Sequence, residues 1–259
     1  ASPEELLVRR LALARRPRPG GVILPGPGRG ANGRDLPRVE GHKAGVEAVR
    51  DVVEATARLE IPVLTLYAFS VENWKRPRFE VWTLMNLIKE YVRTELDTLV
   101  KNGIRLRVLG RWRELDPSVV EILDEALEAT RDGTRMTLNI ALNYSGRCEV
   151  VDACRRIVQE WAAGERVDID EETLGRHLYT SGQPDPDLLI RTSGEMRVSN
   201  FLLWQIAYSE IWVTPTLWPD FRRGELFTAL LDYQSRDRRY GGACDQVAGS
   251  DAGRQRQQG

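Results

Sequence analysis

Short apolar runs alternate with longer amphipathic stretches along most of this chain. Runs with the length and composition of buried strands cover residues 22–24, 61–69, 104–110, 136–144, 187–194 and 209–215. Stretches that repeat apolar residues at helical spacing predict helices over 44–60, 78–101, 117–131 and 147–163. Strands that alternate with helices across short connections indicate an α/β fold, with a central, mainly parallel six-stranded sheet flanked by helices.

The order of these elements favours one domain, because no internal repeat or low-complexity linker separates them. Residues 3–16 place leucines at helical spacing, and a Pro- and Gly-rich breaker follows. We therefore predict an N-terminal helix and linker at 1–19, one folded domain at 20–242, and a polar tail at 243–259. The tail lacks aromatic residues, and we expect it to be disordered.

Composition adds mainly exclusions. The 259 residues carry 37 Lys and Arg against 38 Asp and Glu, so the formal net charge of -1 creates no global attraction to nucleic acid or an anionic membrane. Three cysteines without CxxC spacing and two histidines argue against a structural zinc site. The apolar runs are too short to span a bilayer, and residues 1–19 lack the apolar core of a signal peptide. We expect a cytoplasmic protein that binds no nucleic acid and makes at most peripheral membrane contact.

Polar or glycine-rich segments follow four of the predicted strands. They are PGPGRG at 25–30, SVENWKRP at 70–77, NYSGR at 143–147 and RTSGEMRVSN at 191–200. Ligands of open parallel sheets bind at the carboxyl ends of the strands, so these four segments are the first candidates for a site.

The segment 191–200 has the side chains of a diphosphate clamp. Arg191 and Arg197 offer two guanidinium groups, and Ser193 and Ser199 offer two hydroxyl donors. The alternative is a solvated loop in which the arginines pair with Glu195 and nearby acids. Composition leaves both interpretations open.

The segment 70–77 offers a second set of polar and aromatic side chains. Trp74 has the shape to cap an apolar substrate channel, while Asn73 and Arg76, with Ser70 beside them, can orient a charged head group. The alternative is an aromatic residue that packs under a loop ending at Pro77.

Two further positions are weaker candidates when each is considered alone. Arg38 and His42 precede the helix predicted at 44–60, where both can face an anion near the helix N-terminus, although a lone histidine there is more often a cap or a packing residue. Glu210 is a candidate metal ligand, but a single carboxylate near a strand is weak support for a metal site.

In order and spacing, these segments together resemble the cis-prenyltransferases, of which undecaprenyl diphosphate synthase is the bacterial type. The resemblance is carried by LPRVEGHKAGVEAVRDVV, LTLYAFSVENWKRP, LNIALNYSGR, PDPDLLIRTSGEMRVSNFLLWQIAYSEIWVTPTLWPDF and RDRRYGG. It extends from about residue 20 to 242, roughly nine-tenths of the chain. It implies a homodimer with an apolar tunnel that holds the prenyl chain.

The resemblance also implies roles for individual residues. It assigns allylic diphosphate binding to Gly26, Gly28, Arg29, Arg38 and His42. It assigns the diphosphate of isopentenyl diphosphate to Arg191, Arg197 and Ser199, and a contribution to the diphosphate region across the dimer to Arg239 and Gly241. We count Ser70 as a further diphosphate-binding candidate. It assigns condensation to Asn73, Trp74, Arg76 and His42, and it places Glu210 in a magnesium site.

One segment departs from the family pattern. Where the family reads Asp-Gly-Asn-Gly-Arg-Trp, this chain reads PGPGRG, so Pro25 replaces the Mg²⁺-holding aspartate, Pro27 an asparagine and Gly30 a tryptophan. Proline supplies neither an oxygen ligand nor a backbone N–H. The loop's arginine and two of its glycines remain, so we expect anion binding to be weakened without being abolished.

The leading hypothesis is a non-standard enzyme of this fold that acts on allylic prenyl diphosphates of C10–C20. The reaction would be terpene-synthase-like ionisation and cyclisation, or an atypical condensation with isopentenyl diphosphate, and Mg²⁺ would need a replacement ligand such as Glu210, Asp35 or Glu40. One alternative is a non-catalytic partner subunit of a heteromeric cis-prenyltransferase, because such partners lack the aspartate and supply the Arg-x-Gly present here at 239–241. Another is a conventional polyprenyl diphosphate synthase of low activity.

Overall fold

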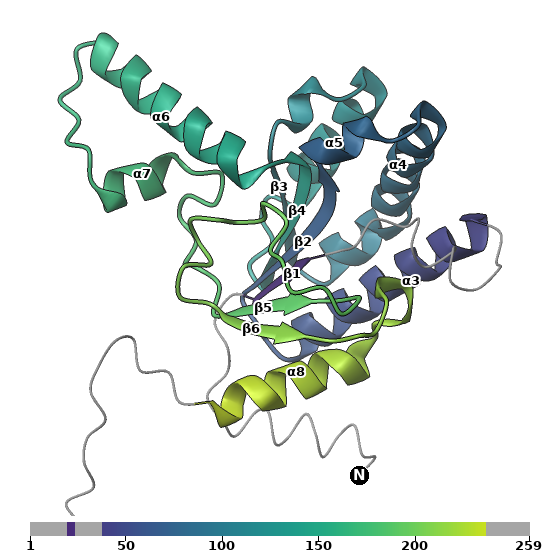
Figure 1. The fold of residues 1–259 in the computed structure, drawn as a ribbon. Coiled ribbons are helices and arrows are strands. Elements are labelled where there is room, and N and C mark those ends of the chain that lie inside the picture. Colours follow the sequence, from purple (N-terminus) through teal and green to yellow (C-terminus); the bar gives the residue numbers. More distant parts are fainter. Residues whose placement is uncertain (1–19, 24–37, 237–259) are drawn as a thin grey trace, which may run out of the picture.

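Six parallel strands form the centre of the fold (Figure 1). The computed structural model describes residues 20–23 and 38–236, with side chains from residue 44 onward. The strands are β1 Gly20–Ile23, β2 Val63–Ser70, β3 Ile104–Leu109, β4 Met136–Tyr144, β5 Leu188–Arg191 and β6 Glu210–Val213. They lie in the order β3-β4-β2-β1-β5-β6, and every pairing is parallel. The predicted six-stranded parallel sheet is therefore confirmed.

Four of the six described helices overlap the predicted ones. They are α3 Arg38–Arg58, α4 Arg78–Lys101, α5 Pro117–Ala129, α6 Gly146–Ala162, α7 Glu171–His177 and α8 Arg223–Ser235. The helix predicted at 44–60 begins six residues earlier, at Arg38, because its first turns are polar and carry no apolar period. The last two helices were not predicted. α7 is too short to show a period, whereas α8 buries one face that includes Leu226, Leu230 and Tyr233.

The two faces of the sheet are covered differently. One face carries a large apolar core shared with α3, α4, α5 and α8, and Leu64 and Leu66 of β2 point into it. The other face carries a smaller cluster that includes Tyr67, Tyr144, Phe201 and Leu202. A segment with little regular structure, which follows β5, therefore covers this second face, while α6 and α7 pack on each other and project away from the sheet (Figure 1).

The strand ends meet along one edge of the sheet. In the register of the sheet, Ile23 of β1 pairs with Arg191 of β5, and Arg191 pairs with Val213 of β6. On the other side of β1, Ser70 of β2 pairs with Tyr144 of β4. The strand predicted at 187–194 ends at Arg191, because Ser193 and Gly194 adopt positive φ values of 67° and 66° that turn the chain. The polar segments named above thus begin at a common edge wherever the structure describes them.

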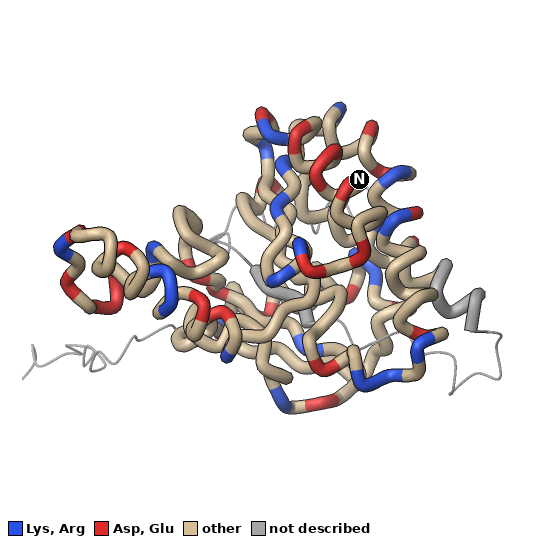
Figure 2. Tube along the Cα trace, turned by 90° about the horizontal axis from the view of Figure 1, so that it is seen from above, with Lys and Arg blue, Asp and Glu red and all other residues tan. Residues whose placement is uncertain are grey.

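Charged residues of both signs are interspersed over the described elements (Figure 2). None of the described helices combines the length and apolar character needed to cross a lipid bilayer. Because the two signs of charge are interspersed, an anion site in this part of the chain must arise from a local cluster of side chains.

Gly110, directly after β3, should be intolerant of any side chain. Its φ is +113°, and an added Cβ would lie 2.3 Å from the carbonyl oxygen of Leu142. Gly164 has a similar φ of +95° with nothing within 4 Å of an added Cβ, so it is a matched control. We expect Gly164→Ala to lower the free energy of unfolding by about 1–3 kcal/mol through backbone strain alone. Gly110→Ala should lower it by about 1–3 kcal/mol more, because backbone overlap is added. Urea unfolding of both variants tests this, and equal losses would contradict it.

Candidate active site

Several predicted site residues lie outside the described residues. These are the loop after β1, with Pro25, Gly26, Pro27, Gly28, Arg29 and Gly30, and the C-terminal pair Arg239 and Gly241. Arg38 and His42 belong to the first turns of α3, but their side chains are likewise outside the described part. The roles that the resemblance implies for these residues stay predictions. The strand order does fix where the loop after β1 starts, between β2 and β5.

Arg191 is a buried cation at the end of β5. Only 4% of its surface is exposed, and its guanidinium is ion-paired with Glu195. Glu195 also accepts from Arg197, with 2.7 Å between Oε1 and Nη2, and Arg197 is largely exposed. The two interpretations of this segment therefore combine: the arginines gather at one carboxylate as the solvated-loop alternative expected, and they also lie together at a strand end.

Three consecutive residues at this strand end carry unsatisfied polar atoms. Nε of Arg191, Oγ1 of Thr192 and Oγ of Ser193 are buried and have no hydrogen-bond partner among the described residues. Buried polar groups in proteins are nearly always hydrogen-bonded, so such a group calls for a partner. All three atoms can donate a hydrogen bond, which suits the oxygens of a diphosphate.

The segment after β2 is folded around its own side chains. Residues Val71–Lys75 form the short helix η1, and the backbone N–H of Ser70 donates to Oδ1 of Asn73 over 2.9 Å. The Trp74 ring contacts Phe69 edge-on, with centroids 5.2 Å apart, yet 46% of its surface is exposed. Trp74 therefore packs on the fold while part of its surface stays exposed, and its contact with a ligand stays a prediction. Arg76, which follows η1 directly, is half-buried.

Asn200 joins three of the strand ends and was not predicted from the sequence. Its Nδ2 donates to Oε1 of Glu72 over 2.9 Å and to Oγ of Ser145 over 2.7 Å, while its Oδ1 accepts from the N–H of Arg147 over 3.0 Å. Its φ is 61°, a left-handed conformation that asparagine tolerates better than most residues. Because Ser199 precedes it, Asn200 fixes the place of one predicted diphosphate ligand.

The buried carboxylate of Glu149 helps to hold the segment that follows β5, and it was likewise not predicted from the sequence. Glu149 on α6 is 1% exposed and accepts hydrogen bonds from Tyr144 Oη, from the N–H of Tyr179 over 2.8 Å and from Gln205 Nε2 over 3.1 Å. Tyr144 Oη in turn accepts from the N–H of Leu202 over 3.2 Å. Burial raises the pKa of the Glu149 carboxyl above its ordinary value, and these hydrogen bonds offset only part of that effect.

Glu210 lies away from the other candidate residues within one chain. It opens β6 and pairs in register with Leu188, whereas Arg191 ends the neighbouring strand. Its carboxylate is ion-paired with Arg236 over 2.9 Å. The described residues contain no group of three or more His, Cys, Asp or Glu side chains that could hold a metal ion. The magnesium role of Glu210 stays a prediction.

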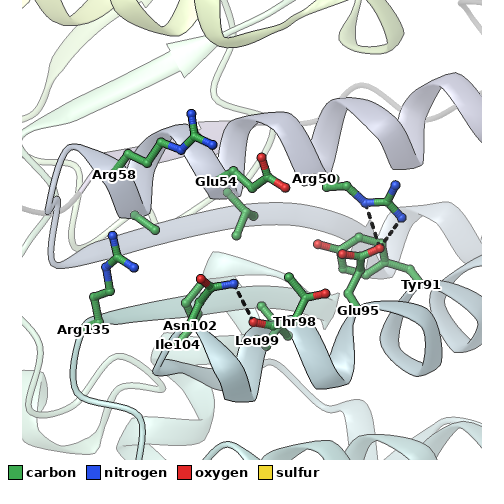
Figure 3. A pocket seen from close by; sticks show the side chains of 12 residues that line it. Arg50, Glu54, Arg58, Tyr91, Glu95, Thr98, Leu99, Asn102, Ile104 and Arg135 are labelled. Carbon is green, nitrogen blue, oxygen red and sulfur yellow. Dashed lines mark hydrogen bonds and ion pairs between the residues drawn. The ribbon is translucent and has the colours of Figure 1, made fainter. Parts of the chain in front are cut away.

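A cavity of about 240 Å³ lies between α3 and α4 (Figure 3). Apolar residues such as Val53 and Leu99 share its wall with charged ones, and Arg50 of α3 is ion-paired across it with the buried Glu95 of α4. It also reaches Ile104, the first residue of β3, and so lies toward the amino ends of the strands. Its wall is more polar than that of the predicted apolar tunnel.

Comparisons with known proteins agree with the family resemblance. Residues 23–241 match the family model described as "Putative undecaprenyl diphosphate synthase". The chain is 50% identical over 244 residues to the isoprenyl transferase of Heliobacterium mobile, covering 93% of this chain and 94% of that one. It is 48% identical over 233 residues to the isoprenyl transferase of Chlorobaculum tepidum, covering 89% and 88%. Among solved structures, lavandulyl diphosphate synthase from Lavandula x intermedia, in complex with dimethylallyl diphosphate, has a TM-score of 0.83 at 34% identity, covering 87% and 98%.

Replacing Glu195 should separate its structural role from ligand binding. Glu195→Gln leaves the buried Arg191 without its counter-charge, so the ligand-free protein should lose up to about 3–5 kcal/mol of stability. Inorganic diphosphate would then supply the missing negative charge. We expect it to raise the melting temperature more in this variant than in the wild type, as measured by calorimetry. Glu172→Gln is the control, because that carboxylate pairs with Arg176 at an exposed position. Equal diphosphate-induced shifts in all three proteins would contradict this account.

The raised pKa of Glu149 predicts a pH dependence of stability. A carboxyl whose folded pKa lies above its unfolded value near 4.5 stabilises the fold fully below that value and loses this contribution as pH rises through the folded pKa. From pH 4.5 upward, the wild type should therefore lose stability relative to Glu149→Gln, by at most about 1.4 kcal/mol per pH unit. Urea unfolding at a series of pH values measures this difference. Glu125→Gln, at an exposed position of α5, gives the background slope, and a difference that stays constant with pH would refute the assignment.

Proposed function

Because the chain belongs to the undecaprenyl diphosphate synthase family of cis-prenyltransferases, we propose that it transfers an allylic prenyl group to isopentenyl diphosphate. The observation that carries this proposal is the buried Arg191, with unsatisfied donors on Thr192 and Ser193 beside it. This cluster lies where β5 adjoins β1. The strands β2, β3 and β4 lie on one side of β1, and β5 and β6 lie on its other side, so the strand order reverses at this point. Such a point is the usual ligand site of an open parallel sheet.

The reaction makes a specific electrostatic demand on the site. The allylic C–O bond breaks, and diphosphate leaves with the electron pair. The double bond of isopentenyl diphosphate then attacks the allylic carbon, and a proton is lost to give the longer allylic product. Negative charge builds on the leaving allylic diphosphate, so donors placed beforehand around that group, which we assign to Arg29, Arg38 and His42, lower the barrier. We assign the diphosphate of isopentenyl diphosphate to Arg191, Arg197 and Ser199, and the reacting carbons to the neighbourhood of Trp74 and Arg76.

Pro25 is expected to slow the ionisation step in particular. When Mg²⁺ is bound, it supplies charge neutralisation on the leaving diphosphate, and an aspartate at this position would help to hold it. The loss of one such stabilising group typically lowers kcat by about 100- to 1,000-fold. Guanidinium groups can still bind a diphosphate directly. We therefore propose a transferase that binds its substrates and turns them over slowly.

A second candidate is a reaction of the allylic diphosphate by cyclisation or irregular coupling. The altered loop at 25–30 favours it, as does the similarity to a structure named lavandulyl diphosphate synthase. A third is the non-catalytic partner subunit, favoured by Arg239 and Gly241 of the Arg-x-Gly segment. The transferase is preferred because relatives near 50% identity carry the name isoprenyl transferase. We propose a homodimer for it, as in the family.

One set of incubations distinguishes the candidates. The purified protein is mixed with C10, C15 or C20 allylic diphosphate, with and without isopentenyl diphosphate and Mg²⁺. Longer prenyl diphosphates formed only with isopentenyl diphosphate support transfer. Diphosphate release without it supports cyclisation. Activity that appears only after a homologue with the family's aspartate is added supports the partner subunit. Inactivity under every condition, together with no binding of inorganic diphosphate, overturns all three candidates.

Restoring the aspartate should raise the rate of transfer. We expect Pro25→Asp to increase kcat for condensation by about 10- to 1,000-fold in the presence of Mg²⁺ and little in its absence, since a carboxylate acts here through the metal. Steady-state rates with radiolabelled isopentenyl diphosphate measure this. Pro27→Asn is the matched control, because it restores an amide in the same loop without a carboxylate. A Pro25→Asp variant no faster than Pro27→Asn would show that the loop is remodelled beyond this one ligand.

A further inference from the structure

Asn143 is a buried residue near the end of β4 whose side-chain amide both donates and accepts a hydrogen bond. It is 6% exposed, and its φ is 48°. Its Nδ2 donates to the carbonyl oxygen of Arg111 over 2.9 Å, and its Oδ1 accepts from Nε1 of Trp74 over 2.8 Å. Its own carbonyl oxygen accepts from the N–H of Arg111 over 3.2 Å. One side chain therefore joins the segments that follow β2, β3 and β4.

The chemistry of the two partners fixes the orientation of this amide. A backbone carbonyl can only accept a hydrogen bond, and an indole N–H can only donate one. The amide nitrogen must therefore face Arg111 and the amide oxygen must face Trp74. The reversed orientation would break both hydrogen bonds, so the contact with the indole is specific.

The backbone of this position also favours asparagine. At positive φ most side chains crowd the backbone, whereas glycine, asparagine and aspartate adopt this conformation more readily. Among these three, only asparagine offers a donor and an acceptor together. Both requirements are met at Asn143.

The result is a tryptophan that is fixed at one edge and open on another side. Asn143 holds the indole N–H, Phe69 contacts the ring edge-on, and 46% of Trp74 remains exposed at the carboxyl edge of the sheet. We propose that Asn143 is a positioning residue for prenyl transfer, which acts through Trp74 by fixing the plane of its ring beside the reacting carbons. This inference rests on the function proposed above.

The consequence should appear in turnover more than in binding. The ring plane matters for the reacting carbons, whereas the diphosphate is assigned to Arg191 and Arg197, which Asn143 does not contact. A displacement of about 1 Å near the reacting atoms can lower a rate by roughly 100-fold. We therefore expect kcat to fall by about 10- to 100-fold when the acceptor is lost, with the KM for isopentenyl diphosphate changed by less than about threefold.

The first measurement needs no substrate. In a protein labelled with ¹⁵N-tryptophan, the indole resonance of Trp74 is assigned by its loss in Trp74→Phe. Asn143→Gly keeps the backbone conformation and removes the acceptor, so this resonance should move upfield. Asn143→Asp keeps an acceptor, so the resonance should stay near its wild-type position. Asn139→Gly is the matched control, because Asn139 is buried on the same strand and hydrogen-bonded to Thr65 and Gln183 instead.

The second measurement is a double-mutant cycle on kcat. If Asn143 acts through the indole, Asn143→Gly should lower kcat in the wild-type background and have little further effect in Trp74→Phe. Asn139→Gly should leave kcat unchanged in both backgrounds. An unchanged indole resonance in Asn143→Gly, or an equal loss of kcat in both backgrounds, would overturn the proposal. A wild type without transfer activity would overturn the proposed function, while the spectrum would still decide the contact between Asn143 and Trp74.

Discussion

A guanidinium group buried at the end of a central strand needs a negative partner, and the structure around β5 is organised by that need. Removing an ion from water costs several kcal/mol unless a counter-charge and hydrogen bonds replace the solvent. Glu195 meets this requirement for Arg191 in the ligand-free chain, but it can do so only because the chain reverses between them. The positive φ values of Ser193 and Gly194 make that reversal, and the N–H of Gly194 is held by the carbonyl oxygen of Thr214 over 2.8 Å. The turn, the ion pair and the start of the segment that covers the second face of the sheet are thus parts of one arrangement.

The ends of the strands also carry several unusual backbone conformations. Asn143, Ser199, Asn200 and Leu202 all have positive φ, and each such residue costs about 1–3 kcal/mol unless its surroundings compensate. The compensation is visible in the side-chain contacts: Asn143 binds Trp74 and Arg111, and Asn200 binds Glu72 and Ser145. A rigid edge of this kind places charged and aromatic groups accurately, and a loop free to relax would not.

The sequence predicted the sheet well because a parallel strand buried on both faces appears as a continuous apolar run, as in residues 61–69 and 136–144. It missed α8, although the buried Leu226, Leu230 and Tyr233 recur there at helical spacing. The run at 187–194 was predicted too long, since the turn at Ser193 depends on hydrogen bonds with Thr214 and Thr216, which follow β6.

The candidate site likewise contains residues that the local sequence predicts and residues that it does not. Strand ends identified Arg191 and Trp74, because position after a strand is a local property. Asn143 and Glu149 were missed because their importance comes from partners as far as 69 residues away in the chain, and no spacing rule contains that information. The pairing of Arg191 with Glu195 could be considered in advance only because both residues lie in one segment.

Under the proposed function, Pro25, which stands where the family resemblance implies an aspartate, changes the balance between binding and ionisation. An aspartate near a diphosphate repels it unless a divalent cation lies between them, so its loss removes a metal ligand and a repulsive charge together. Ground-state binding of isopentenyl diphosphate, which we assign to Arg191 and Arg197, would then suffer little. The transition state suffers more, because charge that develops on the leaving oxygen is no longer met by a fixed cation. Under the proposed function, the chain therefore retains substrate recognition. It keeps its guanidinium groups, the tryptophan held by Asn143, and the strand ends joined by hydrogen bonds. What it gives up is the speed of a single step.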